Sequence, residues 1–281
     1  PGYIHLRGPT EIKPLKDEMV VSAHWPDREV RECEADFRPG DRIIMCSDGV
    51  TQAGLGQRRD MKFGWRRSGV MEFAKRRIEA DGEISARDLS MAIAREARYI
   101  APGGCKDDIS CVVAYLRHPR VMRVLTGPPY YRENDAEYAR QALLGADHTV
   151  ICGGTSTNII ERELGVKVRV SLADIRKSGG LPPVGNIEGI GIATEGILTL
   201  SRVLSAIEEM RPPENEPQAV KMILERMIRH DRIEFVIGTK VNESHQDPGI
   251  PQELELRRSV IRRMQQALER NFRKEVVVYY Y

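Results

Sequence analysis

The sequence carries very little net charge and no long apolar run. Its 43 Lys and Arg residues are nearly balanced by 41 Asp and Glu residues, which leaves a formal net charge of +2 at pH 7. A balance this close provides no general electrostatic attraction to a polyanion, so we expect no nucleic acid partner. No apolar run approaches the ~20 residues that a membrane-spanning helix requires, so we expect no membrane span. Residues 1–3 do not open a basic region followed by an apolar one, and we therefore expect no signal peptide.

Cysteine is also scarce, and its spacing excludes the common metal and redox motifs. The five cysteines are Cys33, Cys46, Cys105, Cys111 and Cys152. Their number is odd and no two of them form a CxxC pair, so free thiols in a cytoplasmic protein are the simplest interpretation. Cys46 and Cys111 fall inside apolar runs, and we expect them to be core residues rather than nucleophiles.

A carboxylate is expected at the end of a buried strand in the first third of the chain. Residues 42–46 form a short apolar run that predicts a strand, and it ends on Ser47-Asp48-Gly49. The glycine would let the backbone turn sharply after the aspartate. A carboxylate at a strand tip can hold Mg²⁺ or Mn²⁺, which prefer oxygen ligands. The alternative at this stage is a solvated Asp-Gly hairpin turn.

A second acidic site precedes another predicted strand. Asp107 and Asp108 come directly before the apolar run 109–115. Like charges brought together repel each other and raise each other's pKa unless a cation lies between them. The two acidic strand ends could meet across one sheet, and a divalent metal site would explain that placement.

These motifs together resemble a known family. The order Pro39-Gly40-Asp41, Ser47-Asp48-Gly49, Lys62-Phe63-Gly64 and residues 106–113 (Lys-Asp-Asp-Ile-Ser-Cys-Val-Val) is similar to the C-terminal half of a metal-dependent PPM (protein phosphatase 2C-like) domain of the bacterial stage II sporulation protein E family. The resemblance covers residues 1–118. It implies an α+β fold, part of a sandwich of two antiparallel sheets with helices outside. It also implies that the domain opens upstream of residue 1, with a first metal-binding Gly-Asp motif there, so this piece alone is not expected to have full activity.

The resemblance further implies an activity. Relatives are protein serine/threonine phosphatases of signalling systems, in which two Mn²⁺ or Mg²⁺ ions activate a water that attacks the phosphorus of phosphoserine or phosphothreonine without a covalent enzyme intermediate. Carried over to this chain, Asp48 and Asp107 would be metal ligands. Asp108 belongs to the same metal site and would orient it. The catalytic group would be the activated water rather than a side chain, and the partner would be a phosphorylated protein.

Helices are expected between the two acidic strand ends. Residues 69–80 carry apolar positions at helical spacing, and Ser85 with Asp88 predicts a capped helix that runs to about residue 99. His5 and His24 have no partner at metal spacing, and we expect both to be ordinary surface or core histidines.

From residue 119 to residue 281 the pattern changes to alternating strands and helices. This alternation predicts a separate α/β domain with a mainly parallel sheet covered on both faces. The predicted strands are 121–125, 149–152, 166–172, 233–237 and 276–280. The predicted helices are 134–144, 159–164, 194–210, 218–230 and 253–271.

Three strand exits of this second domain could form one pocket at the carboxyl edge of its sheet: 126–129, 153–158 and 238–240, the last with Asn242 and His245. The ligand-binding candidates are Gly153, Gly154, Thr155 and Ser156. Glycines let an anion approach the backbone, and hydroxyl groups at a helix start can bind it. The alternative is a set of ordinary strand-to-helix turns with Thr and Ser caps. The pattern lacks the Gly-Lys-Ser/Thr of a P-loop and the third glycine of a dinucleotide-binding loop.

Two functions of different class are therefore open. One is a metal-dependent protein phosphatase with a regulatory α/β domain. The other is a binding module, in which the α/β domain recognises a small anion and the phosphatase portion is incomplete. Residues 150–241 also resemble an uncharacterised domain that follows such phosphatases in some anaerobic bacteria, which adds no activity. The oligomeric state is open, with a homodimer as one option.

Overall fold

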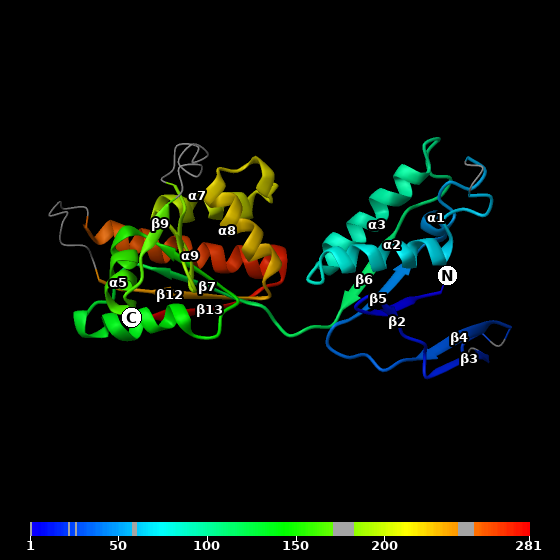
Figure 1. Ribbon diagram of the computed structural model, residues 1–281, viewed down its shortest axis with the longest axis horizontal. Helices are drawn as coiled ribbons and strands as arrows, with labels where there is room; N and C mark the ends of the chain where they lie inside the picture. Colours follow the sequence, from blue (N-terminus) through cyan, green and yellow to red (C-terminus); the bar gives the residue numbers. More distant parts are fainter. Residues whose placement is uncertain (1, 22, 26, 58–60, 171–182, 241–249) are drawn as a thin grey trace. The chain divides into compact units, whose positions relative to one another are not determined.

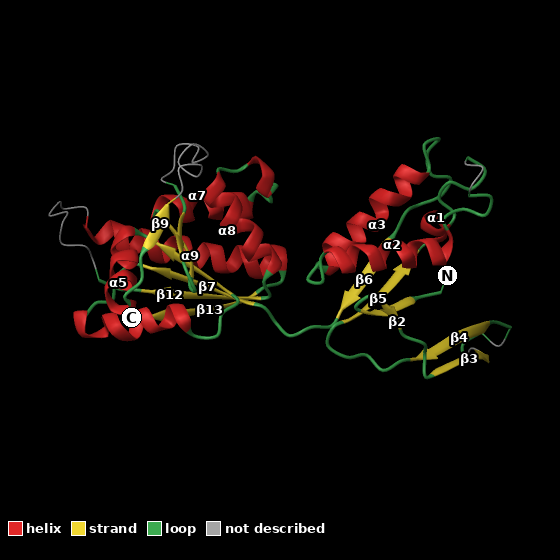
Figure 2. Cartoon of the chain, viewed as in Figure 1, coloured by secondary structure: helices red, strands yellow, loops and turns green. Residues whose placement is uncertain are grey.

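The chain divides into two compact units, Pro1–His118 and Pro119–Tyr281, and each is described by itself. The computed structural model describes residues 2–21, 23–25, 27–57, 61–170, 183–240 and 250–281 (Figure 1). Figure 2 shows that both units combine helices with strands. Asn242 and His245, which the sequence placed at the third strand exit, lie outside the described residues.

The first unit is built on a four-stranded antiparallel sheet with the strand order β2-β1-β5-β6. Its strands are β1 (Ile4–Arg7), β2 (Thr10–Glu11), β5 (Asp41–Cys46) and β6 (Cys111–Tyr115). Ile4 on β1 pairs with Ile44 on β5, and Cys46 on β5 pairs with Cys111 on β6. The apolar runs of β5 and β6 are thus immediate neighbours, although their paired cysteines are 65 residues apart in the sequence. A metal site shared by the two acidic strand ends requires this arrangement.

Helices cover one face of this sheet (Figure 1). They are α1 (Asp48–Thr51), α2 (Arg66–Ala80) and α3 (Ala86–Ile100). Their apolar side chains form one buried cluster with alternate residues of the strands: Ile4, Leu6, Ile44, Val50, Ala53, Trp65, Val70, Ala74, Ile78, Ile84, Leu89, Ile93, Ala97 and Ile100. The predicted cap of α3 is confirmed, since the Ser85 side chain accepts a hydrogen bond from the Asp88 N–H at 3.0 Å.

Helix α2 begins three residues before the predicted start at residue 69. Gly69 lies inside the helix, where a Cβ atom would come within 2.4 Å of the Trp65 ring. The glycine therefore makes room for a buried tryptophan and does not mark a helix boundary. This role follows from the orientation of the Trp65 ring in the folded structure, which the sequence around Gly69 does not specify.

Among the described residues, the first unit has one layer of the expected two-sheet sandwich. Its remaining strands, β3 (Lys16–Val21) and β4 (Glu29–Glu34), form a separate two-stranded antiparallel ribbon. The sheet face away from α2 and α3 carries Met45 and Val112, which are 49% and 56% exposed. The sandwich stays a prediction from the resemblance.

The second unit has a seven-stranded sheet in the order β13-β12-β7-β8-β11-β10-β9. Its strands are β7 (Val121–Thr126), β8 (His148–Cys152), β9 (Val168–Val170), β10 (Gly185–Ile187), β11 (Gly191–Thr194), β12 (Arg232–Ile237) and β13 (Glu275–Tyr280). The neighbours from β13 to β11 all pair in parallel, which confirms a mainly parallel sheet, while β10 and β9 pair antiparallel at one edge.

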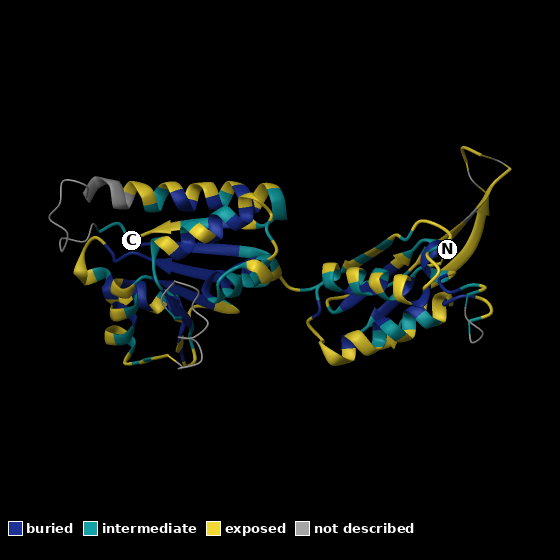
Figure 3. Ribbon diagram, turned by 90° about the horizontal axis from the view of Figure 1, so that it is seen from above, coloured by how far each residue is buried: buried dark blue, intermediate teal, exposed yellow. Residues whose placement is uncertain are grey.

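Helices cover both faces of this sheet because its strands are apolar on both sides (Figure 3). The helices and 3₁₀ turns are η1 (Arg132–Asn134), α4 (Asp135–Arg140), η2 (Gln141–Leu143), α5 (Gly154–Leu164), α7 (Ile197–Glu208), η3 (Pro213–Asn215), α8 (Gln218–Arg229) and α9 (Ile250–Phe272). Val124 and Leu125 are both fully buried, yet they belong to different clusters. Adjacent strand residues point to opposite faces, so a strand buried on both sides reads as a continuous apolar run.

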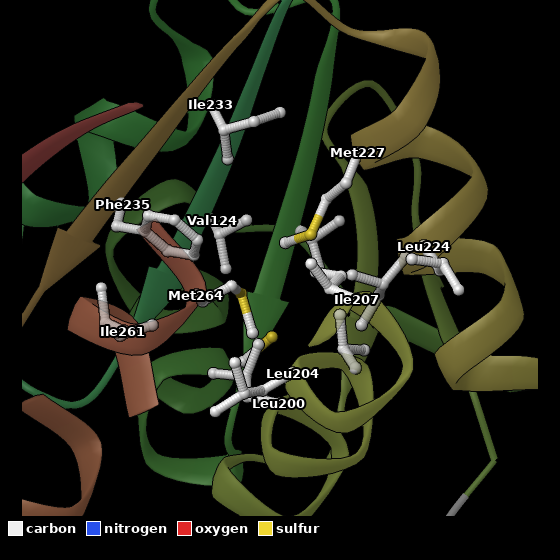
Figure 4. Packing of buried hydrophobic residues seen from close by; sticks show 14 of the residues in the cluster. Val124, Leu200, Leu204, Ile207, Leu224, Met227, Ile233, Phe235, Ile261 and Met264 are labelled. Carbon is white, nitrogen blue, oxygen red and sulfur yellow. The ribbon is translucent and has the colours of Figure 1, made fainter. Parts of the chain in front are cut away.

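The larger cluster joins the sheet to α7, α8 and α9. Figure 4 shows Val124 and Phe235 from the strands packed with Leu204 of α7, Met227 of α8 and Met264 of α9. The smaller cluster joins the opposite face to α4 and α5. Each unit therefore has a hydrophobic core of its own.

Two boundaries in the second unit differ from the sequence prediction. Helix α5 starts at Gly154 rather than at residue 159, so the stretch expected to be a loop is the first turn of a helix. Strands β10 and β11 begin between the predicted elements 166–172 and 194–210, where no strand was predicted, and α7 begins only at Ile197. Among the described residues, no helix is long and apolar enough to cross a membrane.

Candidate metal centre at the ends of β5 and β6

The candidate metal residues follow and precede two paired strands. Asp48 comes two residues after β5 ends, and Asp107 and Asp108 lie in the segment that leads into β6. Because β5 and β6 are antiparallel neighbours, the end of one lies beside the beginning of the other. The structure therefore brings the two acidic segments to the same edge of one sheet.

Ser47 connects the two segments directly. Its backbone N–H donates to the Ser110 carbonyl at 2.9 Å, and its hydroxyl donates to the Asp108 carbonyl at 2.7 Å. The same hydroxyl oxygen accepts from the Ser110 N–H at 3.0 Å. A side chain thus takes over the pairing where the ladder between the strands ends. The local sequence does not indicate this role, since a serine before Asp-Gly is more typical of a helix cap, and Ser47 makes no such cap bond here.

Gly49 allows the closest backbone approach at this edge. A Cβ atom at this position would lie 2.4 Å from the Asp108 carbonyl oxygen and 2.9 Å from that of Asp107. Gly49 lies in helix α1 and is absent from the described glycines with positive φ. The backbone conformation at Gly49 therefore does not itself call for glycine, and the hairpin alternative is wrong because α1 begins here. Glycine is required because the backbone at Gly49 touches the backbone of Asp107 and Asp108.

All three candidate carboxylates are exposed to solvent. One Asp48 oxygen accepts the N–H of Gly49 at 3.1 Å, and one Asp107 oxygen accepts the N–H of Asp108 at 2.8 Å. Within the described part of the chain, none of the three forms an ion pair with a lysine, arginine or histidine. No direct ion pair with a described side chain therefore offsets their negative charge, although Arg98 lines the same hollow as Asp107 and Asp108.

A second clamp holds the loop before Asp107. The Gln57 side-chain amide donates to the Gly104 carbonyl at 2.8 Å, and its oxygen accepts the Gly103 N–H at 2.9 Å. An open hollow lies beside this loop, and Asp107, Asp108 and Arg98 are among the residues that line it. Nothing in the sequence around Gln57 distinguishes it from a solvated loop residue.

The donor atoms at this edge fit a hard divalent cation in kind, because carboxylate oxygens are what Mg²⁺ and Mn²⁺ prefer. In number they are a partial set. Among the described residues, no group of three or more Asp, Glu, His or Cys side chains is placed to hold a metal ion. His5, which was expected to be an ordinary surface or core histidine, is a core histidine whose Nε2 lies 2.9 Å from an Asp41 oxygen.

The four ligand-binding candidates of the second unit lie at the start of α5. Gly153 has a positive φ of 113° and precedes the helix without providing a side-chain cap. Gly154 and Thr155 are exposed, and a Cβ atom at Gly154 would meet nothing within 4 Å. Ser156 is 1% exposed, yet its hydroxyl has no hydrogen-bond partner in the described part of the chain.

The three strand exits of the predicted pocket take part in two separate backbone contacts. The exit after β8 lies against the exit after β11, since the Gly153 N–H donates to the Thr194 carbonyl at 2.9 Å. The other two exits pack on each other, and a Cβ atom at Gly238 would lie 2.1 Å from the Pro128 carbonyl oxygen. These last two exits meet at the point where the strand order reverses, between β7 and β12, and backbone atoms fill the contact there.

Comparisons with known proteins give a limited result. No protein family model matches the chain, and no curated protein matches it. Two solved structures are similar, both of the phosphatase domain of the cell fate determinant SpoIIE from Bacillus subtilis, the second presoaked with Mn. They are 18% and 19% identical to this chain and have a TM-score of 0.26. The match covers 41% of this chain and 48% and 46% of theirs, so it spans about half their length.

Proposed function

We propose that the first unit is the metal-binding part of a protein serine/threonine phosphatase that uses two Mn²⁺ or Mg²⁺ ions. One observation supports the proposal: Asp48 and the Asp107–Asp108 pair flank adjoining ends of β5 and β6, and none of the three forms an ion pair with a described cation. Like charges at adjoining strand ends repel each other, and a divalent ion between them would offset that repulsion.

In this proposal the side chains hold the ions and the backbone fixes the side chains. Asp48 and Asp107 would be ligands, and Asp108 would orient the site. Bound ions of this type supply Lewis-acid activation of water and offset the charge on phosphoryl oxygens. The Ser47 hydroxyl and the close approach at Gly49 keep the two acidic segments in register. The substrate would be a phosphoserine or phosphothreonine in a protein, as in bacterial signalling.

Metal affinity tests the ligand assignment without any assay of activity. Mn²⁺ is titrated into the chain by calorimetry and by electron paramagnetic resonance. Asp48→Asn and Asp107→Asn should each weaken Mn²⁺ binding by at least about tenfold, because each removes a charged oxygen donor. Glu79→Gln, on the exposed face of α2, removes the same charge elsewhere in the unit and should leave the affinity unchanged. Equal affinities in all four proteins would exclude these ligands.

Hydrolysis tests the reaction. A chromogenic phosphate monoester is supplied with and without Mn²⁺ to this chain and to the product of its whole reading frame. The activity should depend on the metal and should fall at least about 100-fold in Asp48→Asn and Asp107→Asn, since several kcal/mol of transition-state stabilisation comes from the ions. Activity that both variants retain in full would rule out the enzyme assignment.

A specific observation also favours the second function, recognition of a small anion by the second unit. The Ser156 hydroxyl is buried at the first turn of α5 and has no partner, and Ser156 lies near the buried phenol of Tyr138. The Tyr138 hydroxyl is also without a hydrogen-bond partner in the described part of the chain, and burial raises the pKa of this phenol. An unpaired buried hydroxyl costs free energy, and an anion at the helix N-terminus would satisfy it together with the free N–H groups there.

Thermal unfolding in the presence of inorganic phosphate tests this second function. Phosphate should raise the melting temperature of the wild type. It should have little effect on Gly154→Val, which fills the open space at the helix start, or on Ser156→Ala. Ser205→Ala, on α7, removes a hydroxyl away from the site and should respond like the wild type. No stabilisation, or the same stabilisation in every variant, would contradict anion binding at α5.

A further inference from the structure

Two thiols lie opposite each other on the paired strands of the first unit. Cys46 on β5 and Cys111 on β6 are direct cross-strand partners, and their sulfur atoms are 3.6 Å apart. Partners in an antiparallel ladder point to the same face, and both side chains pack against the hydrophobic cluster beneath α2 and α3. All five cysteines are described, and this is the one pair of thiols in contact.

The local ladder geometry suits a bond between the two sulfur atoms. The next pair along, Ser47 and Ser110, is joined by a backbone hydrogen bond of 2.9 Å. Pairs in an antiparallel ladder alternate, so Cys46 and Cys111 form a pair without mutual backbone hydrogen bonds, in which Cα atoms are typically about 4.5 Å apart and side chains are closer. That spacing lies inside the range that disulfides tolerate, about 4.4–6.8 Å. The sulfur atoms need to approach by only about 1.5 Å to reach bonding distance.

We propose that Cys46 and Cys111 are an oxidation site that a hydroperoxide converts to a cross-strand disulfide. Both thiols are partly exposed, so a small oxidant can reach them. The other cysteines have different surroundings: Cys33 donates to an Asp17 oxygen at 3.4 Å, and Cys152 is fully buried. The inference stands on the two thiols and does not depend on phosphatase activity.

The chemistry balances in two steps. One thiol loses its proton, and its sulfur attacks the terminal oxygen of the hydroperoxide. The O–O bond breaks, an alcohol leaves with that proton, and a sulfenic acid remains. The second sulfur then attacks the sulfenic sulfur, the S–O bond breaks, and the hydroxide leaves as water with the second thiol's proton. Two thiols lose two electrons in total, and the hydroperoxide is reduced to an alcohol and water. With hydrogen peroxide both products are water.

The bond would lie directly beneath the candidate metal centre. Cys46 is two residues before Asp48, and Cys111 follows Asp107 by four residues. A disulfide here closes a chain loop between residues 65 positions apart. Closing a loop of that length restricts the unfolded chain and should raise the melting temperature of the first unit by about 5–10 °C.

Mass spectrometry of the full chain tests the proposal. The reduced protein is treated with a slight excess of hydrogen peroxide, and its remaining thiols are then alkylated and counted. The count should fall from five to three, the mass should fall by two hydrogens, and a non-reduced digest should contain a Cys46–Cys111 peptide pair. Dithiothreitol should restore all five thiols and reverse the rise in melting temperature.

Single substitutions provide the matched comparison. Cys46→Ser and Cys111→Ser should each prevent the intramolecular bond, whereas Cys33→Ser and Cys105→Ser should form it as the wild type does. Mapping of the wild-type disulfide keeps the proposal testable if a strand variant does not fold. Recovery of Cys46 and Cys111 as free thiols, while other cysteines have oxidised or joined two chains, would overturn it.

Discussion

At the scale of single residues, the first unit depends on a buried carboxylate on the sheet face away from the helices. Asp41 is fully buried, and it accepts two hydrogen bonds from the Arg7 guanidinium, at 2.6 and 2.8 Å, and one from the Arg38 N–H at 2.9 Å. Burial by itself would raise the pKa of Asp41, but the hydrogen bonds from Arg7, Arg38 and His5 outweigh burial and hold that pKa well below its usual range. The ionised form is therefore stabilised by folding.

The first prediction follows from that direction. Asp41→Asn should lower the free energy of unfolding of the first unit by about 2–4 kcal/mol at pH 7, because Arg7 loses a charged partner at a buried site. A carboxyl group with a lowered folded-state pKa contributes stability above its unfolded pKa of about 4 and loses it as the pH falls toward the folded value. The difference between wild type and variant should therefore shrink in urea titrations from pH 6 to pH 2. A difference that stays constant with pH would contradict this account.

The second prediction concerns the close contact at Gly49. Gly49→Ala should destabilise the first unit and weaken Mn²⁺ binding, because the added methyl group meets the Asp108 carbonyl oxygen at 2.4 Å and one of the two backbones must move. Destabilisation of about 1–3 kcal/mol is expected for such overpacking. Gly82→Ala is the matched control, since a Cβ atom there meets nothing within 4 Å. Equal effects of both substitutions on metal affinity would show that the contact at Gly49 has no special role.

The sequence predicted the partnership of the two acidic segments better than it predicted how they are held. Two apolar runs, each with an acidic end, are enough to suggest neighbouring strands. The bridge made by Ser47 and the clamp made by Gln57 depend on atoms 46 to 63 residues away. No local pattern specifies such partners, which is why both residues were missed.

At the scale of elements, helix starts were predictable where a side chain marks them. Ser85 accepts the Asp88 N–H and begins α3 one residue later, in agreement with the sequence. At α5 the start is two glycines without a capping side chain, and the predicted start at residue 159 is five residues too late. Strand β11 was missed for a related reason: a Cβ atom at Gly191 would lie 2.0 Å from the Thr149 carbonyl oxygen, so this strand begins with a glycine that normally signals a loop.

The third prediction concerns the cap of α3. Ser85→Ala should lower the free energy of unfolding of the first unit by about 1 kcal/mol, because the Asp88 N–H loses its acceptor. Ser85→Asp should retain most of the stability, since its carboxylate can accept the same hydrogen bond. Chemical denaturation measures both variants. An alanine variant as stable as the wild type would show that the cap bond contributes nothing.

At the scale of the whole molecule, the alternating pattern after residue 119 predicted a mainly parallel sheet, and the structure confirms it. The predicted strand 166–172 contains β9, but the pattern supplied neither β10 nor its antiparallel pairing, since an edge strand three residues long has no distinct period. The strand order is also a property of the assembled sheet rather than of any segment in it.

The fourth prediction is that the two units unfold separately, because each has its own core. Asp41→Asn should shift only the transition of the first unit. Leu204→Ala, which removes a buried side chain from the second unit, should shift only the other transition, by about 2–5 kcal/mol. Calorimetry of the full chain and both variants measures this. A single transition that moves with either substitution would contradict separate unfolding.

The central claim is that the acidic ends of β5 and β6 share a metal ion. The most direct measurement is anomalous X-ray scattering at the manganese edge from crystals grown with Mn²⁺. We predict an anomalous peak within ligand distance of carboxylate oxygens from both Asp48 and Asp107, and no such peak in Asp48→Asn crystals. Crystals saturated with Mn²⁺ in which the two carboxylates point to opposite sides of the strand ends, with no ion between them, would contradict the claim.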